Sequence, residues 1–179
     1  MKGLTLITGS AGKAKEYVVL LGFEIETEKI DLPEIQSTNV VEVVREKAKV
    51  AYEKLQRPVI VDDTGLTIKA WKNLPGALIK WFLQNVGDHG IVEMLGDKQR
   101  DALVTTAIGY CDENGVRIFT GEVAGKISDK PRGKNGFGYD TIFIPGDSDL
   151  TYAEMTDDEK NKTSMRAMAV AKLKAFLQN

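Results

Sequence analysis

The sequence predicts a mixed α/β fold formed by one domain over residues 1–179. In the first half, short apolar runs alternate with segments whose apolar residues recur at helical spacing. In the second half, two strand-like runs flank a typical turn. With 179 residues, 42% of them hydrophobic, the chain is long enough to bury a core without disulfides or a structural metal.

The elements of the first half follow the order strand, helix, strand, helix, strand. Apolar or alternating runs predict strands at residues 4–8, 23–29 and 58–61. Helices are predicted between them, at about residues 13–21 and 40–55. The second of these helices has the clearer pattern, because Val43, Val44, Ala48 and Ala51 recur near helical spacing.

The second half predicts two helices, an antiparallel hairpin and a final helix. The helices are expected at 77–85 and 89–95, and the hairpin strands at 102–110 and 116–120 around a turn at 112–115. Further strands are expected at 121–127 and 141–144, and a last helix at about 164–177. A Thr-x-x-Glu capping box at 156–159 predicts a helix start there. We expect two lobes around a cleft.

Composition and charge exclude several classes of protein. The 24 basic and 26 acidic side chains give a formal net charge of −2, so we expect neither nucleic acid nor a membrane surface as a partner. The single Cys111 excludes an intramolecular disulfide and a cysteine-based zinc cluster, and the single His89 excludes a histidine-pair metal site. The apolar run near the start is too short for a signal peptide, and we expect a soluble cytoplasmic protein.

The first segment that could carry chemistry is Thr-Gly-Ser-Ala-Gly-Lys at residues 8–13. Glycines let backbone N–H groups approach an anion, the start of a helix favours negative charge, and Lys13 adds a full positive charge. The segment lacks the spacing of a P-loop. The alternative is an ordinary strand–helix turn with a solvated lysine.

The second segment is the pair Asp62–Asp63 after an apolar strand. Acidic residues in this position can hold Mg²⁺ and orient a water molecule. Because neighbouring strand residues face opposite sides, at most one of the two carboxylates easily enters a given cleft. The alternative is a pair of aspartates that forms a turn.

Two later segments combine aromatic and cationic side chains. In residues 131–140, glycines flank Phe137 and Tyr139, whose ring faces suit stacking with a nucleobase. The alternative is a glycine-rich hairpin with two core aromatics. Lys160 and Arg166 could donate to a base carbonyl or a phosphate, or could lie on a solvated helical turn.

Taken together, these segments resemble the inosine triphosphate pyrophosphatase family over nearly the whole chain. The motifs that carry the resemblance are at residues 8–13, 30–34, 62–66, 74–76, 80–82, 136–140, 151–155, 159–161 and 164–166. No single motif is decisive, but their joint occurrence in this order is highly specific.

The resemblance implies an elongated mixed β-sheet with flanking helices, two lobes around a central nucleotide-binding cleft, and a homodimer. It also implies hydrolysis of deaminated purine nucleoside triphosphates (ITP, dITP and XTP) to the monophosphate and pyrophosphate, which removes them from the nucleotide pool. The implied cofactor is Mg²⁺, with Mn²⁺ as a substitute.

The resemblance assigns roles to particular residues. Glu34 and Asp63 would hold the metal, and Asp63 or the pair Asp62–Asp63 would orient and deprotonate the attacking water. Lys47 and Lys13 would neutralise the triphosphate. The implied substrate-binding residues are Thr8, Gly9, Ser10, Gly12, Lys13, Thr64, Phe137, Gly138, Tyr139, Asp140, Lys160 and Arg166.

Two positions depart from the family pattern. Ser10 replaces the usual asparagine, and Met165 replaces the histidine of a Ser-His-Arg motif. Methionine cannot donate a hydrogen bond to the O6 atom of a purine. We therefore expect that catalysis survives, whereas base selectivity is weakened or rebuilt around Lys160 and Arg166.

Two other functions are weighed. One is a nucleotide pyrophosphatase of the septum-formation-inhibitor type, acting on modified pyrimidine or dTTP-like nucleotides, which the segments around Phe137 and Lys160 argue against. The other is a non-catalytic nucleotide sensor. The arguments against it are the retained residues Glu34, Lys47, Asp62 and Asp63, because a protein that only binds nucleotides has little need for a metal-bound water.

Overall fold

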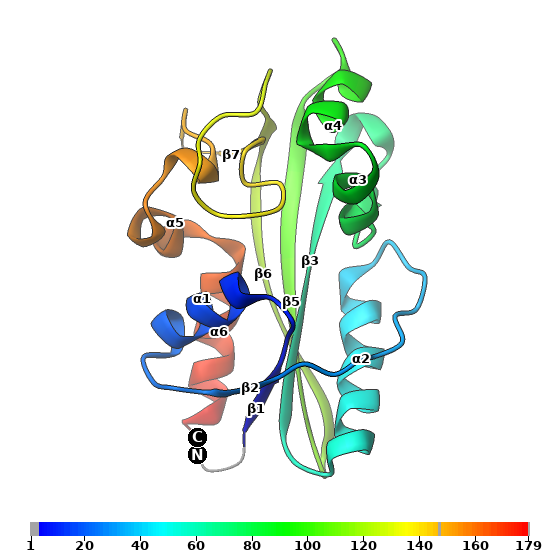
Figure 1. Cartoon of the computed structure of the whole chain (residues 1–179), viewed down its shortest axis with the longest axis vertical. Helices are drawn as coiled ribbons and strands as arrows, with labels where there is room; N and C mark the ends of the chain where they lie inside the picture. Colours follow the sequence, from blue (N-terminus) through cyan, green and yellow to red (C-terminus); the bar gives the residue numbers. More distant parts are fainter. Residues whose placement is uncertain (1–3, 147, 179) are drawn as a thin grey trace.

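The computed structural model describes residues 4–146 and 148–178 as an α/β fold with a mixed seven-stranded sheet and flanking helices (Figure 1). The strand order is β2-β1-β3-β5-β6-β7, and β4 pairs with β3 beside this path. None of the described helices is long and apolar enough to cross a membrane.

The strands are β1 (Thr5–Ile7), β2 (Glu26–Glu28), β3 (Val59–Ile68), β4 (Leu74–Gly76), β5 (Asp101–Asp112), β6 (Gly115–Ile127) and β7 (Phe143–Pro145). The α-helices are α1 (Ala11–Leu21), α2 (Val40–Leu55), α3 (Ile79–Asn85), α4 (Gly87–Leu95), α5 (Asp157–Thr163) and α6 (Met165–Leu177), and short 3₁₀ helices cover Lys69–Trp71 and Tyr152–Glu154.

Strand β3 lies in the middle of the sheet and carries the aspartate pair. It runs parallel to β1 and antiparallel to β5. The predicted end of this strand at residue 61 is wrong, and so is the alternative that Asp62 and Asp63 form a turn. The strand continues to Ile68 because its second half pairs with the start of β5.

Two other predicted boundaries are corrected. The strands expected at 116–120 and 121–127 form one strand, β6, which pairs with β5 along its whole length. The expected strand at 141–144 begins only at Phe143. The predicted helix at 40–55 and the capping box of Thr156 are confirmed.

Helices cover both faces of the sheet. Helices α1 and α6 pack on one face, where Tyr17, Leu21 and Leu173 meet Leu6 and Ile60 (Figure 1). Helix α2 packs on the opposite face through the valines and alanines of its apolar stripe. A third cluster joins α3 and α4 to the second half of β3 and the first half of β5.

Helix α6 lies unusually close to β6 at Gly121. A Cβ atom at this position would overlap the carbonyl oxygen of Met165. The absence of a side chain therefore lets the first turn of α6 rest directly on the strand. Ser164 caps this turn, because its hydroxyl accepts a hydrogen bond from the N–H of Ala167 at 3.2 Å. The contact fixes the height of Met165 and Arg166 above the sheet.

Candidate active site

Two adjoining cavities lie between α3 and α1. The first, of about 270 Å³, is lined on one side by α3 and on the other by the start of α6 and the loop at residues 137–140. The second, of about 460 Å³, is lined by the β1–α1 loop, residues 29–34, Lys47 and the aspartate pair. Four residues line both cavities: Ser10, Lys13, Asp63 and Lys80. The two cavities therefore share a wall.

Almost every residue assigned by the resemblance lines one of these cavities. The first cavity contains Thr64, Phe137, Gly138, Tyr139, Asp140, Lys160 and Arg166, and the second contains Thr8, Gly9, Glu34, Lys47 and Asp62. Gly12 has a different task, because a Cβ there would lie only 2.9 Å from the Phe137 ring. Glycine at this position lets the aromatic ring rest on the start of α1.

Asp62 and Asp63 leave β3 in opposite directions, as the strand geometry predicts. The side chain of Asp62 is 1% exposed, whereas that of Asp63 is 22% exposed. Asp62 forms ion pairs with Lys13 at 2.7 Å and Arg166 at 2.9 Å. Burial alone would raise the pKa of Asp62, but these two cations outweigh it and lower the pKa to about 2. Asp62 is therefore a permanent anion that holds two cations.

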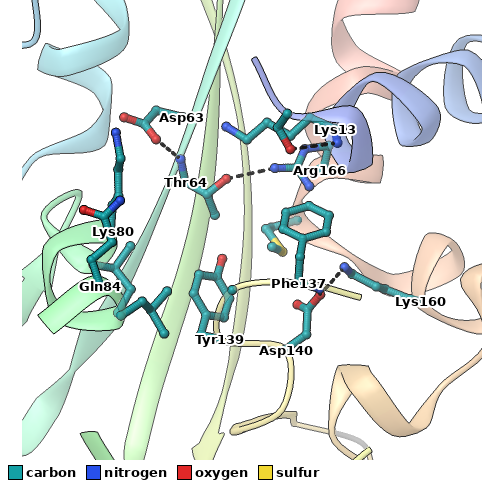
Figure 2. A pocket seen from close by; sticks show the side chains of 15 residues that line it. Lys13, Asp63, Thr64, Lys80, Gln84, Phe137, Tyr139, Asp140, Lys160 and Arg166 are labelled. Atoms are coloured by element: carbon teal, nitrogen blue, oxygen red, sulfur yellow. Dashed lines mark hydrogen bonds and ion pairs between the residues drawn. The ribbon is translucent and has the colours of Figure 1, made fainter. Parts of the chain in front are cut away.

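Asp63 faces the cavities beside Lys47. Its Oδ2 atom lies 4.0 Å from the Lys47 ammonium, which also pairs with Glu34 at 2.7 Å. The Oδ1 atom of Asp63 accepts a hydrogen bond from the N–H of Thr64 at 2.8 Å, which sets the rotation of the carboxylate (Figure 2). Burial raises the pKa of Asp63 more than Lys13 and Lys47 lower it. Of the two aspartates, Asp63 is thus the better proton acceptor.

Six ionised side chains of alternating sign form what we call the ion-pair chain. Its members, in order of contact, are Asp140, Lys160, Glu16, Arg166, Asp62 and Lys13. The Lys160 ammonium lies 2.7 Å from Asp140 and 3.1 Å from Glu16, and Arg166 donates to Glu16 and Asp62. Three anions neutralise three cations, which is how such a buried group of charges is tolerated.

Glu16 was missed by the sequence reasoning. It lies one helical turn after Lys13 on α1, so the two side chains share a face of the helix. That spacing was the available signal. Its partners Lys160 and Arg166 are 144 and 150 residues away, and no local pattern reports such contacts.

Both rings of the aromatic loop line the first cavity, but they differ in exposure. Tyr139 is buried, whereas Phe137 is 40% exposed, so the alternative of two core aromatics is wrong for Phe137. The Lys160 ammonium lies 4.9 Å from the centroid of the Phe137 ring, within range of a cation–π contact. Asp140 accepts a hydrogen bond from the N–H of Phe137 at 2.8 Å and thereby holds the loop.

Helix α3 supplies the opposite wall, which the sequence reasoning did not assign to the site. Figure 2 shows Lys80 and Gln84 across the cavity from Lys13, Phe137 and Arg166. Lys80 occurs in one of the motifs of the resemblance, but it was given no role. Met165 also lines this first cavity, and it is 2% exposed.

The two positions that depart from the family pattern have clear structural roles. The Ser10 hydroxyl accepts a hydrogen bond from the N–H of Lys13 at 3.3 Å and so caps α1. The N–H of Ser10 donates to the Thr8 hydroxyl at 3.1 Å. Met165 presents an apolar side chain to the cavity in which Lys160 and Arg166 carry the donors.

Comparisons with known proteins match nearly the whole chain. The model of the Ham1 family matches residues 4–176. Inosine triphosphate pyrophosphatase 2 of Trypanosoma cruzi is 43% identical over 96% of this chain and 90% of its own length. The dITP/XTP pyrophosphatase of Methanopyrus kandleri is 39% identical over 96% of this chain and 94% of its own length. The solved structure of the Staphylococcus aureus Ham1 protein is similar with a TM-score of 0.85 and 27% identity, covering 99% of this chain and 98% of that one.

Proposed function

Because the chain belongs to the Ham1 family, we propose that it is a nucleoside triphosphate pyrophosphatase that hydrolyses ITP, dITP and XTP to the monophosphate and pyrophosphate. The observation that carries this proposal is the pair of adjoining cavities with Lys13 and Asp63 in their shared wall. One cavity has an aromatic ring and buried cations, and the other has several lysines and a glycine-rich loop.

We assign each part of the substrate to one of the two cavities. The base lies in the first cavity against Phe137, and the triphosphate lies in the second, along the β1–α1 loop. The α-phosphate is then at the shared wall, next to Asp63. Phosphoryl transfer needs mainly positioning and neutralisation of charge, and Lys13 and Lys47 supply positive charge on both sides of that point.

The residues present fit a bound Mg²⁺. Glu34 and Asp63 are two carboxylates held near each other by Lys47, and Mg²⁺ in nucleotide-processing sites is held by one or two carboxylates together with substrate phosphates. In sites of this kind, substrate phosphates and water supply the other ligands of the ion. When bound, the ion supplies charge that stabilises the phosphates during transfer. Mn²⁺ satisfies the same oxygen ligands.

In the proposed reaction, Asp63 orients a water molecule and accepts its proton. The water oxygen forms a bond to the α-phosphorus, and the bond from this phosphorus to the oxygen that bridges to the β-phosphorus breaks. That oxygen leaves with pyrophosphate. Asp62 is unsuited to the proton transfer, because its side chain is buried and its pKa is about 2.

Selection of a 6-oxo purine requires donors aimed at O6, where adenine presents an amino donor instead. Lys160 and Arg166 are the cations that line the base cavity close to Phe137. Arg166 already donates to Glu16, Asp62 and Thr64, so only part of its donor capacity is left for a base. Lys160 likewise donates to Glu16 and Asp140, so we assign base recognition to both cations together.

The remaining expectations are part of the same proposal. The chain forms one domain whose two lobes face each other across the cavities, with α3 and α4 in one lobe and α1 and α6 in the other. The resemblance supports a homodimer and a cytoplasmic location.

The test is pyrophosphate release from ITP, XTP, dITP, GTP, ATP and dTTP in the presence of Mg²⁺. Asp63→Asn is the critical variant, and Asp129→Asn, at an exposed position outside both cavities, is its matched control. We expect fast release from ITP, dITP and XTP, slow release from ATP, and a loss of about 10² to 10⁴ in kcat for Asp63→Asn.

Three other outcomes would change the conclusion. Preference for dTTP would favour the septum-formation-inhibitor type. Binding of ITP without release from any triphosphate would favour a sensor. Wild-type turnover by Asp63→Asn would show that another group accepts the proton.

A further inference from the structure

We propose that Lys29 is a further substrate-binding residue, which contacts the terminal phosphates of the nucleotide. The inference rests on the proposed function, because it needs a triphosphate in the second cavity. It adds a residue that directly follows β2 and that none of the motifs around the reaction centre includes.

The structure holds the Lys29 side chain over the glycine-rich loop. The N–H of Thr8 donates to the carbonyl of Glu28 at 3.0 Å, so the loop and the end of β2 lie side by side. Three side-chain carbons of Lys29 lie 3.4–3.5 Å from the position that a Cβ on Gly9 would occupy. The alkyl stem thus packs on the backbone of the loop, and the ammonium follows immediately beyond it.

The charge of Lys29 is free to meet a ligand. The second cavity contains four lysines, of which Lys13 is paired with Asp62 and Lys47 with Glu34. Within residues 4–146 and 148–178, Lys29 has no ion pair or side-chain hydrogen bond. An unpaired ammonium beside backbone amides at the start of a helix is a favourable contact for a phosphate.

The position of Lys29 along the cavities indicates which phosphate it meets. Lys13, Asp63 and Lys80 line both cavities, whereas Lys29 lines only the second. A nucleotide with its base in the first cavity passes the shared wall with its α-phosphate. The β- and γ-phosphates, which become the leaving pyrophosphate, then extend toward Lys29.

The experiment compares Lys29→Gln, which removes the charge, with Lys29→Arg, which keeps it. Lys98→Gln is the matched control, because Lys98 is exposed and lies outside both cavities. We expect Lys29→Gln to raise the KM for ITP about tenfold, the cost of one charge-assisted contact at an open site. The inhibition constant of IMP, which lacks the terminal phosphates, should stay unchanged. Lys29→Arg should restore the KM.

A second measurement does not depend on turnover. Isothermal titration of inorganic triphosphate in the presence of Mg²⁺ should show about tenfold weaker binding to Lys29→Gln than to the wild type or to Lys98→Gln. Equal affinity in all three proteins, or no binding to any of them, would overturn the proposal. So would equal weakening of ITP and IMP, which indicates a structural role. If the protein hydrolyses no nucleotide but its binding of triphosphate depends on Lys29, the role of Lys29 in phosphate binding is supported and the proposed function is refuted.

Discussion

Asp62 and Asp63 are chemically identical neighbours with different surroundings. The carboxylate of Asp62 lies between the cations of Lys13 and Arg166, whereas the carboxylate of Asp63 borders both cavities. The different surroundings of the two carboxylates therefore separate two tasks that the sequence alone left open. Asp62 stabilises the folded protein and holds Lys13 and Arg166, and the proposed proton transfer belongs to Asp63.

This division predicts how stability responds to acid. The folded-state pKa of Asp62, about 2, is below the ordinary value of 3.8. The contribution of Asp62 to the free energy of unfolding is therefore complete above about pH 4 and is lost as the pH falls toward 2. A pKa shift of this size is worth about 2 to 3 kcal/mol. Urea denaturation between pH 5 and pH 2.5 should show a shallower decline for Asp62→Asn than for the wild type. Equal slopes would contradict the role of Asp62, and Asp129→Asn should keep the wild-type slope.

Met165 allows a second test at this scale. A histidine in place of Met165 would add a nitrogen donor to a cavity that already contains Lys160 and Arg166. We expect Met165→His to raise the preference for ITP over ATP by about tenfold to a hundredfold, measured as the ratio of kcat/KM values. Met168→His, on the same helix but 42% exposed, is the control. If the ITP/ATP and ITP/GTP ratios are unchanged, Met165 does not limit selectivity.

At the scale of elements, the contact between α6 and β6 determines the position of the buried Arg166 side chain. Helix α6 carries Arg166 in its first turn, and Gly121 lets that turn rest on the strand. A shift of the helix would therefore move Arg166 relative to Asp62 and Glu16. Gly121 therefore affects both the stability of the fold and the position of Arg166 in the site.

Gly121→Ala should accordingly reduce both stability and activity. The added methyl group meets backbone atoms of Met165 and Ala169, which cannot move without displacing the helix. We expect a loss of about 1 to 3 kcal/mol in the free energy of unfolding, measured by chemical denaturation, together with a higher KM for ITP. Ala124→Ser, at an exposed position of the same strand, should change neither. Wild-type stability of Gly121→Ala would show that the helix and strand are less closely packed.

The elements were predictable from the sequence to the extent that their pattern is local. Helix α2 was predicted with its observed bounds, because its apolar residues recur regularly and it forms along a single stretch of chain. The extent of β3 was not predicted, because Asp and Gly are poor strand formers and only pairing with β5 extends the strand through them. Most of the residues that line the two cavities lie in the sequence motifs. Glu16 was missed because its contacts join opposite ends of the chain.

At the scale of the whole molecule, the site draws on segments from almost the entire chain. Helix α1 near one end and helix α6 near the other meet through Glu16 and Arg166, and α3 closes the cavity from the opposite side (Figure 1). The two proposed metal ligands both lie beside Lys47, whose ammonium is 2.7 Å from Glu34 and 4.0 Å from Asp63.

This leads to a prediction about removal of the metal. Treatment with EDTA should stop pyrophosphate release from ITP, and Mg²⁺ or Mn²⁺ should restore it. The melting temperature of the substrate-free protein should stay the same, because Glu34 and Asp63 then lie beside Lys47 instead of beside an ion. Both quantities can be measured on the same EDTA-treated sample. A fall in melting temperature on EDTA treatment would indicate a structural metal and contradict this account.

The ion-pair chain also restricts how this enzyme can be re-engineered. Because its six charges alternate, neutralising any one of them leaves at least one buried neighbour short of an opposite charge. In a randomised library, viable clones should change these six positions in compensating pairs, and single replacements should be depleted. Freely variable positions for directed evolution of a new base preference are instead those of the opposite wall, such as Leu83 and Gln84, where a side chain can be exchanged without breaking an ion pair.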